Sequence, residues 1–417
     1  PNNDATPDVV INVAEAGTIA VGGTSGCDSA ESAVASGANT ITLDGNGAGG
    51  AMSDGTYTCT ITFTDSLGNA ASALTLTAFT IDATAPTVTI TAAQVSSGGS
   101  YNADVTLTFD FSETVTGFTQ ADVTVSGCTL GATTDNGDTT FTAACTSPDE
   151  GAVTIDIAAG GDGSSVEDAA GNDVTAATQF TWTHDETNPT IGITTVGGNG
   201  YVTNAEHSAG IQIVGTTTGA NSQTVTVDYG GVTATCAVAS NAFTCTLAGN
   251  PSVSDGTITV TADVDDAAGN SATQASTLAI QDTVVPTVSE VTAVSTPGKD
   301  STPNVVIRSN EAGTLSYSTC TFGSATAASV AANTDTTLTL DADGGGTGLA
   351  DASYANCVIT VTDTAGNGGT VTLTTFVIDT TVAAATEGTA VSTPGNDGTP
   401  DVVISVAEAG TVAVGGS

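Results

Sequence analysis

The feature that most constrains the fold is a pair of short motifs that recurs about every 100 residues. Asp266-Ala-Ala-Gly-Asn270 is followed by a strand-like run and then by Asp282-Thr-Val-Val-Pro286. Near copies of the first motif lie at 65–69, 168–172 and 363–367, and near copies of the second at 82–86, 185–189 and 379–383. A fixed period of this kind is the signature of an array of small domains.

The period predicts four domains and the start of a fifth. Their boundaries are 1–84, 85–187, 188–284 and 285–381, with a further repeat beginning at 382–417. The first repeat opens on a segment that is the second strand of later repeats, so its first strand is missing. Residues 394–417 match residues 1–24 at 19 of 24 positions. The chain is either a window of a longer tandem array, which we favour, or a subunit that donates its tail strand to the next subunit.

Composition favours an all-β fold. Thr, Val, Ile and Ala are strand-forming or buriable, and 50 Gly and 11 Pro separate the short runs that they form. The formal charge of −42 excludes nucleic acid and anionic membranes as electrostatic partners and favours cations. A charged fraction of only 11% argues against a disordered acidic tail.

Eight cysteines fall two to each repeat. We predict the disulfides Cys27–Cys59, Cys128–Cys145, Cys236–Cys245 and Cys320–Cys357. None of the pairs has Cys-x-x-Cys spacing, so an oxidising compartment outside the cytoplasm is indicated. The second and third pairs are symmetric about two-residue turns, Asn136-Gly137 and Ser240-Asn241, which predicts cross-strand disulfides at non-hydrogen-bonded positions of two hairpins.

Further motifs carry a family resemblance. The segments 111–118 (FSETVTGF) and 121–125 (ADVTV), together with the two recurring motifs, resemble the tandem bacterial immunoglobulin-like domains of giant surface proteins and adhesins. The resemblance covers the whole chain. It implies a Greek-key β-sandwich of seven strands, A to G, in each repeat, a head-to-tail rod of repeats, and in many members calcium at the junctions. Residues 54–59 are similar to strand F of antibody domains, but the antibody Trp is absent, so no recognition loops are implied.

This topology predicts a metal site at each junction. The F–G turn and the B–C loop lie where the chain enters a sandwich, and strand G ends at the exit. Each linker Asp should therefore meet the F–G turn and the B–C Glu of the following repeat. The predicted ligands are Asp82 with Glu113, Asp168 and Asn172; Asp185 with Asp266 and Asn270; Asp282 with Glu311, Asp363 and Asn367; and Asp379 with Glu408. Oxygen ligands without Cys or His fit Ca²⁺.

The junctions are not all equivalent in sequence. The second lacks a B–C Glu, for which Glu186 or Asp265 could substitute, and Glu15 of the first repeat faces whatever precedes it. A second group of candidate calcium ligands lies in Gly-rich E–F loops: Asp44, Asn46 and Asp54, and Asp341, Asp343 and Asp351. Neither loop completes the EF-hand pattern.

Simpler interpretations exist for each motif. Asp-x-x-Gly-Asn can be a hairpin turn alone, Asp-x-Thr-x-Pro a stiff linker, and the E–F loops flexible segments with solvated acids. A metal ion is favoured because three acidic elements meet at one end of each domain. Their carboxylates would repel one another by about 1 kcal/mol per pair, and a divalent cation would turn this repulsion into attraction.

The function that these features predict is mechanical. His184 and His207 are the only histidines, and neither lies in a nucleophile motif, so we expect no enzyme. We expect a structural segment of a long extracellular fibre or stalk on a prokaryotic cell surface, with calcium-rigidified junctions. Its partners would be neighbouring repeats of the same chain or filament. The alternatives are a ligand-binding adhesin region, with a surface or glycan ligand outside this segment, and a self-assembling filament, sheath or surface-layer subunit.

Overall fold

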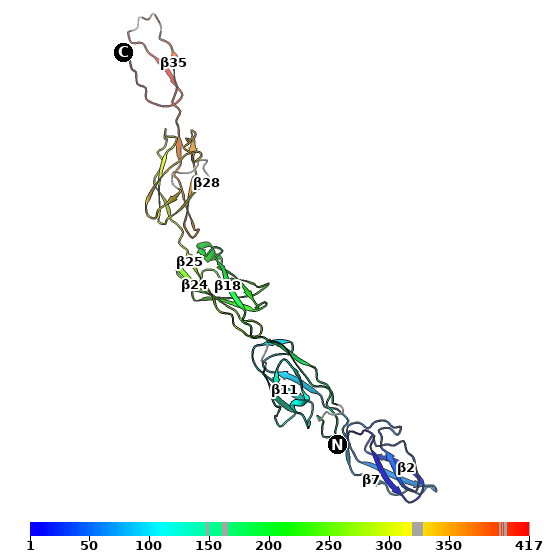
Figure 1. Ribbon diagram of the computed structural model, residues 1–417. Coiled ribbons are helices and arrows are strands. Elements are labelled where there is room, and N and C mark those ends of the chain that lie inside the picture. Colours follow the sequence, from blue (N-terminus) through cyan, green and yellow to red (C-terminus); the bar gives the residue numbers. More distant parts are fainter. Residues whose placement is uncertain are drawn as a thin grey trace. The chain divides into compact units, whose positions relative to one another are not determined.

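The computed structural model describes residues 1–146, 150–160, 166–318, 328–391, 393, 395 and 398–416. These residues are almost entirely strands and loops, with one short α-helix, α1 (Asn204–Ala209), and one 3₁₀ turn (Gln120–Asp122) (Figure 1). No helix among them is long and apolar enough to cross a membrane. The chain forms two compact units, one of residues 1–190, 218–223 and 264–273, the other of residues 191–217, 224–263 and 274–417.

Two sheets and a short ribbon form the first repeat. Its strands are β1 (Asp8–Val13), β2 (Gly17–Gly23), β3 (Ala33–Val34), β4 (Gly37–Thr42), β5 (Gly55–Tyr57), β6 (Cys59–Asp65), β7 (Leu74–Thr75) and β8 (Phe79–Ile81). β1 pairs with β4, β5 pairs with β8, and the order β3-β2-β6-β7 forms a four-stranded sheet. Ile11 and Ile41 from the first sheet and Ile19 and Ile61 from the four-stranded sheet belong to one buried core.

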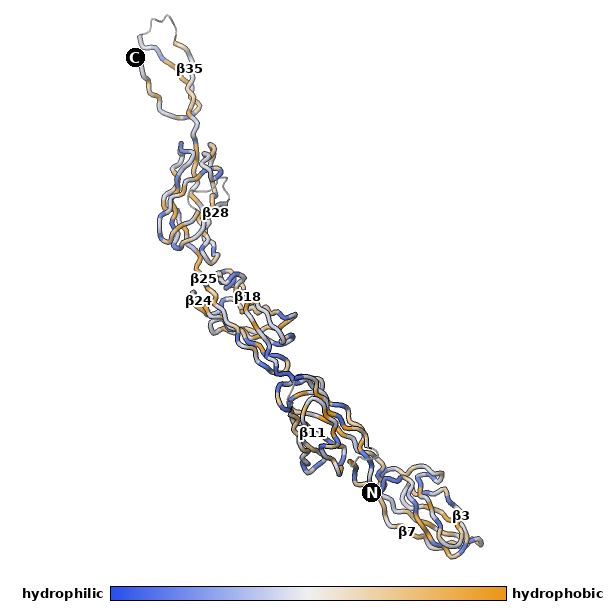
Figure 2. Tube along the Cα trace, viewed as in Figure 1, coloured by the Kyte–Doolittle hydropathy of each residue, from blue (hydrophilic) through white to orange (hydrophobic). Residues whose placement is uncertain are grey.

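The second repeat is a two-sheet sandwich. Its strands are β9 (Val88–Ala92), β10 (Gly99–Tyr101), β11 (Val105–Phe111), β12 (Thr124–Ser126), β13 (Thr129–Leu130), β14 (Thr134–Asp135), β15 (Thr140–Thr146), β16 (Gly151–Asp156) and β17 (Phe180–His184). The sheet orders are β13-β15-β11-β9 and β10-β17-β16-β12. Alternation along β11 buries Leu107 and Phe109 against Ile155 and Trp182 of the other sheet. Figure 2 shows hydrophobic and hydrophilic residues interleaved along such strands.

The third and fourth repeats are also built from two main sheets, with differences in which strands pair at the edges. The third has β18 (Thr190–Val196), β19 (Tyr201–Thr203), β20 (Gln212–Thr218), β21 (Thr224–Tyr229), β22 (Val232–Ala237), β23 (Ala242–Thr246), β24 (Gly256–Asp263) and β25 (Ala275–Asp282), in the orders β18-β20-β23 and β19-β25-β24-β21-β22. The fourth has β26 (Val288–Thr292), β27 (Asn304–Ser309), β28 (Gly313–Ser318), β29 (Ser329–Val330), β30 (Asp335–Thr339), β31 (Ala352–Tyr354), β32 (Val358–Thr362), β33 (Gly368–Thr372) and β34 (Phe376–Ile378). Its orders are β26-β27-β30, β29-β28-β32-β33 and β31-β34. β35 (Ala385–Thr389) and β36 (Val403–Val406) follow as an exposed antiparallel pair.

The first repeat differs from the others at one edge. β11, β20 and β27 each pair with the first strand of their own repeat, which is β9, β18 and β26 respectively. Among the described residues β1 has β4 as its only ladder partner, and its Val10 is 67% exposed. β1 is therefore an edge strand of its sheet in the described part of the chain.

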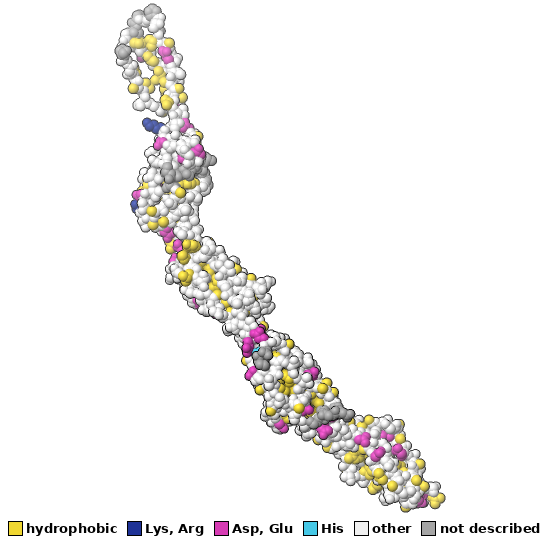
Figure 3. Space-filling model, in the orientation of Figure 1, with side chains coloured by type: hydrophobic (Ala, Val, Ile, Leu, Met, Phe, Trp, Pro, Cys, Tyr) yellow, Lys and Arg dark blue, Asp and Glu magenta, His cyan; other side chains and the backbone are white. Residues whose placement is uncertain are grey.

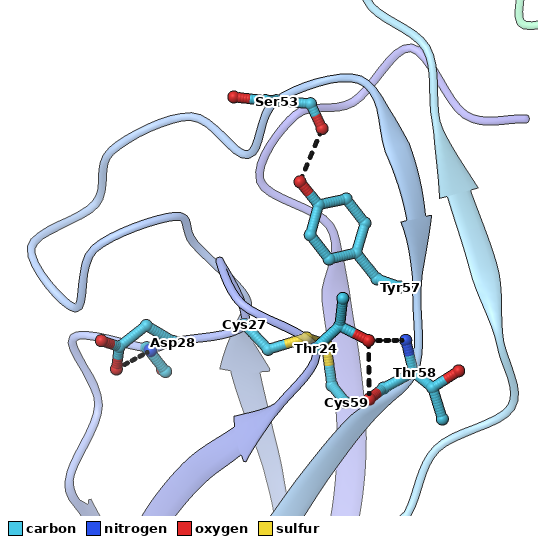
Figure 4. The surroundings of a disulfide bond; sticks show 8 residues. Thr24, Cys27, Asp28, Ser53, Tyr57, Thr58 and Cys59 are labelled. Atoms are coloured by element: carbon cyan, nitrogen blue, oxygen red, sulfur yellow. Dashed lines mark hydrogen bonds between the residues drawn. A yellow bond between two sulfur atoms is a disulfide. The ribbon is translucent and has the colours of Figure 1, made fainter.

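Disulfides join cysteines within repeats. The structure contains Cys27–Cys59, Cys128–Cys145 and Cys236–Cys245, which are pairs that the sequence predicts. Cys357 is also disulfide-bonded, and Cys320, its predicted partner, lies outside the described residues. Beside the first disulfide, the Tyr57 hydroxyl donates to the Ser53 carbonyl at 2.7 Å (Figure 4), so strand F is tied to the loop before it.

The hairpin predicted around Asn136-Gly137 is wrong. Asp135 lies opposite Phe141, so the loop centres on Asp138 and is longer than two residues. The carboxylate of Asp135 accepts the Gly137 amide, and that of Asp138 accepts the Thr140 amide. These side-chain acceptors stabilise the wider loop and shift the register, so Leu130 and not Cys128 lies opposite Cys145.

The turn predicted at Ser240-Asn241 is confirmed. Both residues have positive φ, 52° and 61°, and Ala239 and Ala242 exchange two backbone hydrogen bonds. Beyond the turn, β22 pairs with β21 in one sheet and β23 with β20 in the other. The Cys236–Cys245 disulfide therefore joins the two sheets of the sandwich and not two neighbours within a sheet.

Candidate metal site at the junctions between repeats

The Asp-x-x-Gly-Asn motif folds into a turn held by its own side chains. In the third repeat, Asp266 Oδ1 accepts the amides of Ala268 and Asn270 at 2.8 and 2.9 Å, and Asn270 Nδ2 donates to Asp266 Oδ2 at 2.9 Å. Gly269 has φ of +95°, a conformation that favours Gly. The turns at 65–69, 168–172 and 363–367 have the same Asp–Asn bonds.

The Asn side chain of this turn also contacts the linker from the preceding repeat. Its Nδ2 donates to the main-chain carbonyl of the linker Asp at three successive junctions: Asn172 to Asp82 (2.8 Å), Asn270 to Asp185 (2.7 Å) and Asn367 to Asp282 (2.9 Å). We call this contact the latch. The structure thus brings each of these linker Asp residues to the following F–G turn, as the sequence predicts. The amide of the Asn side chain, however, donates its protons there and offers a cation only its oxygen.

The first junction gathers carboxylates. Asp82, Glu113 and Asp168 each offer one oxygen, and these three oxygens lie within 4.8 Å of one another. No other group of three His, Cys, Asp or Glu side chains among the described residues meets this spacing. Asp168 is only 4% exposed. Such a set of oxygen donors suits Ca²⁺, which prefers carboxylates and carbonyls.

Electrostatics at the first junction oppose the charged form of one carboxyl. Burial, followed by the charges of Asp168, Asp82 and Asp54, raises the pKa of Glu113. Burial also acts to raise the pKa of Asp168, but the Asn172 side chain and the turn amides outweigh it, so this pKa is lowered. Asp168 therefore stays ionised, while the neighbouring charges disfavour the ionised form of Glu113. A bound divalent cation would reverse this repulsion between carboxylates.

The third junction has the same components in a looser arrangement. Burial and the charges of Asp282, Asp363 and Asp255 raise the pKa of Glu311. Glu311 Oε2 is buried and has no hydrogen-bond partner among the described residues. A buried carboxylate oxygen without a donor is costly, and this one lies among three further acids.

The second junction has no carboxylate at the position of Glu113 and Glu311. Ser112 and Thr218 each contact the residue after the linker Pro: the Ser112 hydroxyl accepts the Thr87 amide, and the Thr218 hydroxyl bonds to that of Thr190. Gly219 follows Thr218 and so takes the position of Glu113. The predicted substitutes lie elsewhere: Glu186 Oε1 is 3.4 Å from His184 Nε2, and Asp265 is exposed on the turn. The expectation that Glu186 or Asp265 completes this site is not met, because each of them faces other groups or solvent.

The remaining predicted junction residues lie apart. Asp379 Oδ1 accepts the Thr381 amide at 3.2 Å, and Glu408 is exposed, with no contact between Asp379 and Glu408 in the described part of the chain. At the opposite end of the sequence, Glu15 lines a cavity of about 480 Å³ together with Asp65 and Asn69.

The Gly-rich loops use their acids on their own backbone. Asp44 is 1% exposed, and its two oxygens accept the amides of Asn46, Gly47 and Gly49. Burial acts to raise the pKa of Asp44, but these amides lower it overall. Asp341 repeats the pattern with the amides of residues 343, 344 and 346, while Asn46 and Asp343 accept later amides of the same loops. Amide protons directed at these carboxylates occupy the positions that a cation would need.

Asp54 and Asp351 lie with the linkers and not with these loops. Asp54 Oδ1 accepts the Ala83 amide at 2.7 Å, and Asp351 Oδ1 accepts the Thr380 amide at 2.8 Å. The Ala83 amide lowers the pKa of Asp54, and the Thr381 hydroxyl together with the Thr380 amide lowers the pKa of Asp351. Two acids in the same position of other repeats were not predicted from the sequence: Asp255 accepts the Thr283 amide, and Glu150 accepts the Thr187 hydroxyl. The available signal was an acid directly before strand F in all four repeats.

A second set of missed residues extends from one repeat to the turn of the next. Asn3 Nδ2 donates to the Gly171 carbonyl at 2.9 Å, and Asn102 Nδ2 donates to Asn270 Oδ1 at 2.9 Å. At the third junction it is the main-chain amide of Asn204 that donates to Asn367 Oδ1, at 2.8 Å. All three Asn residues lie shortly before strand B. Their spacing from the recurring motifs varies, so the repeat pattern alone does not single them out.

Comparison with known families agrees with this fold. A family model described as bacterial Ig-like domain matches residues 82–183, the segment that holds the first-junction cluster and its sandwich. Residues 82–183 are a bacterial immunoglobulin-like domain. The third and fourth repeats share the three-strand core β9-β11-β15 of this domain, as β18-β20-β23 and β26-β27-β30. No curated protein matches the chain in sequence.

Similar solved structures include repeats of bacterial adhesins. A Ca²⁺-stabilised adhesin of an Antarctic bacterium that binds ice is 22% identical, covering 90% of this chain and 95% of that one with a TM-score of 0.33. A tetra-tandem repeat from the extending region of a large adhesion protein is 19% identical, covering 91% and 97% with a TM-score of 0.25. Invasin, a bacterial integrin-binding protein, is 14% identical, covering 93% and 78% with a TM-score of 0.35. At these identities and TM-scores, nothing about function is drawn from the likeness.

Proposed function

We propose that this chain is a non-enzymatic structural segment of a long extracellular fibre or stalk on a prokaryotic cell surface. The observation that carries the proposal is the latch, which recurs at three successive junctions with donor–acceptor distances of 2.7–2.9 Å. A hydrogen bond from the next repeat to the linker backbone restricts the linker, whose Pro residues already limit its freedom at 86, 189 and 286. Repeats joined in this way would transmit force along the chain.

Calcium is the cofactor that we propose for the first and third junctions. Asp82, Glu113 and Asp168 supply oxygens at the first. At the third, Asp282, Glu311 and Asp363 interact electrostatically, and a buried Glu311 oxygen lacks a donor. A divalent ion would offset this repulsion and bridge the linker to the next sandwich.

Three further features support an extracellular, structural role. The disulfides indicate an oxidising compartment. The acidic surface in Figure 3 carries very few Lys or Arg side chains and would leave trypsin-like proteases few cleavage sites. The acids before strand F bind linker Thr residues, and those of the Gly-rich loops bind loop amides, so these carboxylates have structural partners.

Small-angle X-ray scattering of the 417-residue chain tests the proposal. We expect an extended particle of fixed maximum dimension in Ca²⁺ and a more flexible one after chelation. Mg²⁺ is the matched control because it demands a smaller octahedral site, and NaCl at equal ionic strength controls for charge screening. A chain that is flexible in every condition would contradict the structural role, whereas a rigid chain that ignores Ca²⁺ would contradict only the calcium sites.

A further inference from the structure

The second junction has a different chemistry from its neighbours. Its turn residues Asp266 and Asn270 are each 7% exposed, and they lie in the same compact unit as Asp185 and Asn102 of the preceding repeat. Every polar atom of the Asn270 side chain is engaged: Nδ2 donates to Asp185 O and Asp266 Oδ2, and Oδ1 accepts from Asn102 Nδ2. This leaves no side-chain oxygen of Asn270 free for a cation. The oxygen of Asn367 at the third junction is also taken, by the main-chain amide of Asn204 at 2.8 Å, so the second junction differs from the third in lacking the B–C carboxylate.

The first junction differs at the equivalent atom. Among the described residues, no hydrogen bond reaches Asn172 Oδ1. The residue in the position of Asn102 is Asn3, since each follows the residue whose carbonyl accepts the amide of the linker Asp. Asn3 bypasses the Asn172 side chain and donates to the Gly171 carbonyl.

Neutral groups also replace the carboxylate on the other side of the second junction. Gly219 stands where Glu113 stands at the first, and a Cβ placed there would contact Pro189 at 3.5 Å. The next residue, Ala220, is fully buried. On the turn itself, a Cβ placed on Gly269 would lie 3.8 Å from Asn102 Nδ2. The interface between these repeats is therefore packed by small residues and closed by one amide–amide hydrogen bond.

We infer that the second junction holds without a cation, and that Asn102 is the residue that closes it by docking on the following Asp-x-x-Gly-Asn turn. The partner that this surface fits is an F–G turn whose Asn oxygen faces the preceding repeat. The contrast with calcium-held neighbours rests on the proposed function, but the Asn102 contact itself does not. The array would then keep one joint fixed while the ion concentration controls the joints on either side.

Hydrogen–deuterium exchange of the full chain, with Ca²⁺ and with chelator, tests this inference. Chelation should speed exchange of the turn amides at 168–172 and 363–367 and leave those at 266–270 unchanged. Asn102→Ala should speed exchange at 266–270 by about fivefold in both conditions, the effect of one lost hydrogen bond. Asn102→Asp keeps the size of the side chain but turns a carboxylate toward Asn270 Oδ1, so it should act in the same direction.

Asn3→Ala is the matched control, because it removes the corresponding contact at the first junction only. Chelation-sensitive exchange at 266–270, or wild-type exchange there in both Asn102 variants, would overturn the inference. If no turn responds to chelation while the Asn102 variants still act, the proposed calcium sites fail and the Asn102 contact stands.

Discussion

The first and second junctions share one latch and differ in what surrounds it. At the first, Asn172 is flanked by three carboxylates with oxygens within 4.8 Å of one another. At the second, Asn270 is flanked by the Asn102 amide and by Gly219. The comparison shows that the same turn can be surrounded by carboxylates, which need a counterion, or by a neutral side-chain amide, which does not. One Glu-to-Gly difference in the B–C loop separates the two solutions.

Removing the latch Asn should have the largest effect, and a larger one at the second junction. Asn270→Ala leaves Asp185 O, Asp266 Oδ2 and Asn102 Nδ2 without a partner in a buried site, which should lower the local free energy of opening by about 3 kcal/mol. Asn172→Ala should cost about 2 kcal/mol, since the Asn172 side chain is less buried than that of Asn270. Hydrogen exchange of the turn amides in chelator measures both.

Asn69→Ala provides the scale for this comparison. Among the described residues Asn69 bonds only within its own turn, with Nδ2 2.7 Å from Asp65 Oδ2. Its loss should cost about 1 kcal/mol. Equal costs at Asn69, Asn172 and Asn270 would show that the linker contacts contribute nothing and that the motif is only a turn.

Removing one carboxylate should distinguish the junctions by calcium affinity. Glu113→Gln should weaken the first-junction site at least about tenfold, equivalent to about 1.4 kcal/mol, because a neutral amide oxygen binds Ca²⁺ less strongly than a carboxylate. Calorimetric titration of the full chain measures this. Glu186→Gln at the second junction is the control and should leave the titration unchanged. A binding event lost in the control would mean that the second junction holds an ion after all.

Acidification in chelator should affect the first junction and spare the second. The folded-state pKa of Glu113 is raised above its usual 4.5, so its contribution to stability is present below pH 4.5 and is lost as the pH rises through the folded value. That of Asp168 is lowered below 3.8, so its contribution is lost only as the pH falls through that lower value. At pH values between the lowered pKa of Asp168 and the raised pKa of Glu113, acidification should increase the free energy of opening of the 168–172 turn. The expected increase is about 0.5 kcal/mol, because solvent screens the charges.

The pH effect is measured by exchange rates at the turn amides, corrected for the intrinsic dependence of exchange on pH. Glu113→Gln should abolish the response. The 266–270 turn should not respond, since no acid occupies the position of Gly219. A parallel response at both turns would point to a global charge effect of the −42 chain and not to Glu113.

The sequence predicts the parts of this site that depend on local chemistry. The recurring Asp, Gly and Asn define the turn because a positive φ and a capping carboxylate are needed there, and topology then places the linker Asp beside the following turn. The role of the Asn as a donor, and the contact of Asn102 with Asn270, depend on side-chain directions across a junction, which no periodicity encodes. Asp54 was assigned to the Asp44 loop for a similar reason: its partner, Ala83, follows 29 residues later.

The same limit applies to the hairpins. Ser240-Asn241 forms the predicted turn, with both residues at positive φ. At Asn136-Gly137, Asp135 and Asp138 offer carboxylates to nearby amides, and this local bonding outweighs the preference of Asn-Gly for a two-residue turn. Turn propensity therefore failed where neighbouring carboxylates accept the loop amides.

The smallest difference between the junctions lies in the acid before strand F. Asp54 accepts a linker amide, that of Ala83, whereas Glu150 accepts only the Thr187 hydroxyl, at 2.5 Å, among its described contacts. Asp54→Ala should therefore speed exchange of the Ala83 amide by about threefold, because this amide loses its acceptor. Glu150→Ala should leave the Thr187 amide unchanged, since that amide donates to Asp185 Oδ1. Asp255→Ala, which frees the Thr283 amide, should behave like the first variant. If all three variants act alike, the acids stabilise their linkers through charge alone, and the distinction between a linker fixed at its backbone and one fixed at a side chain fails.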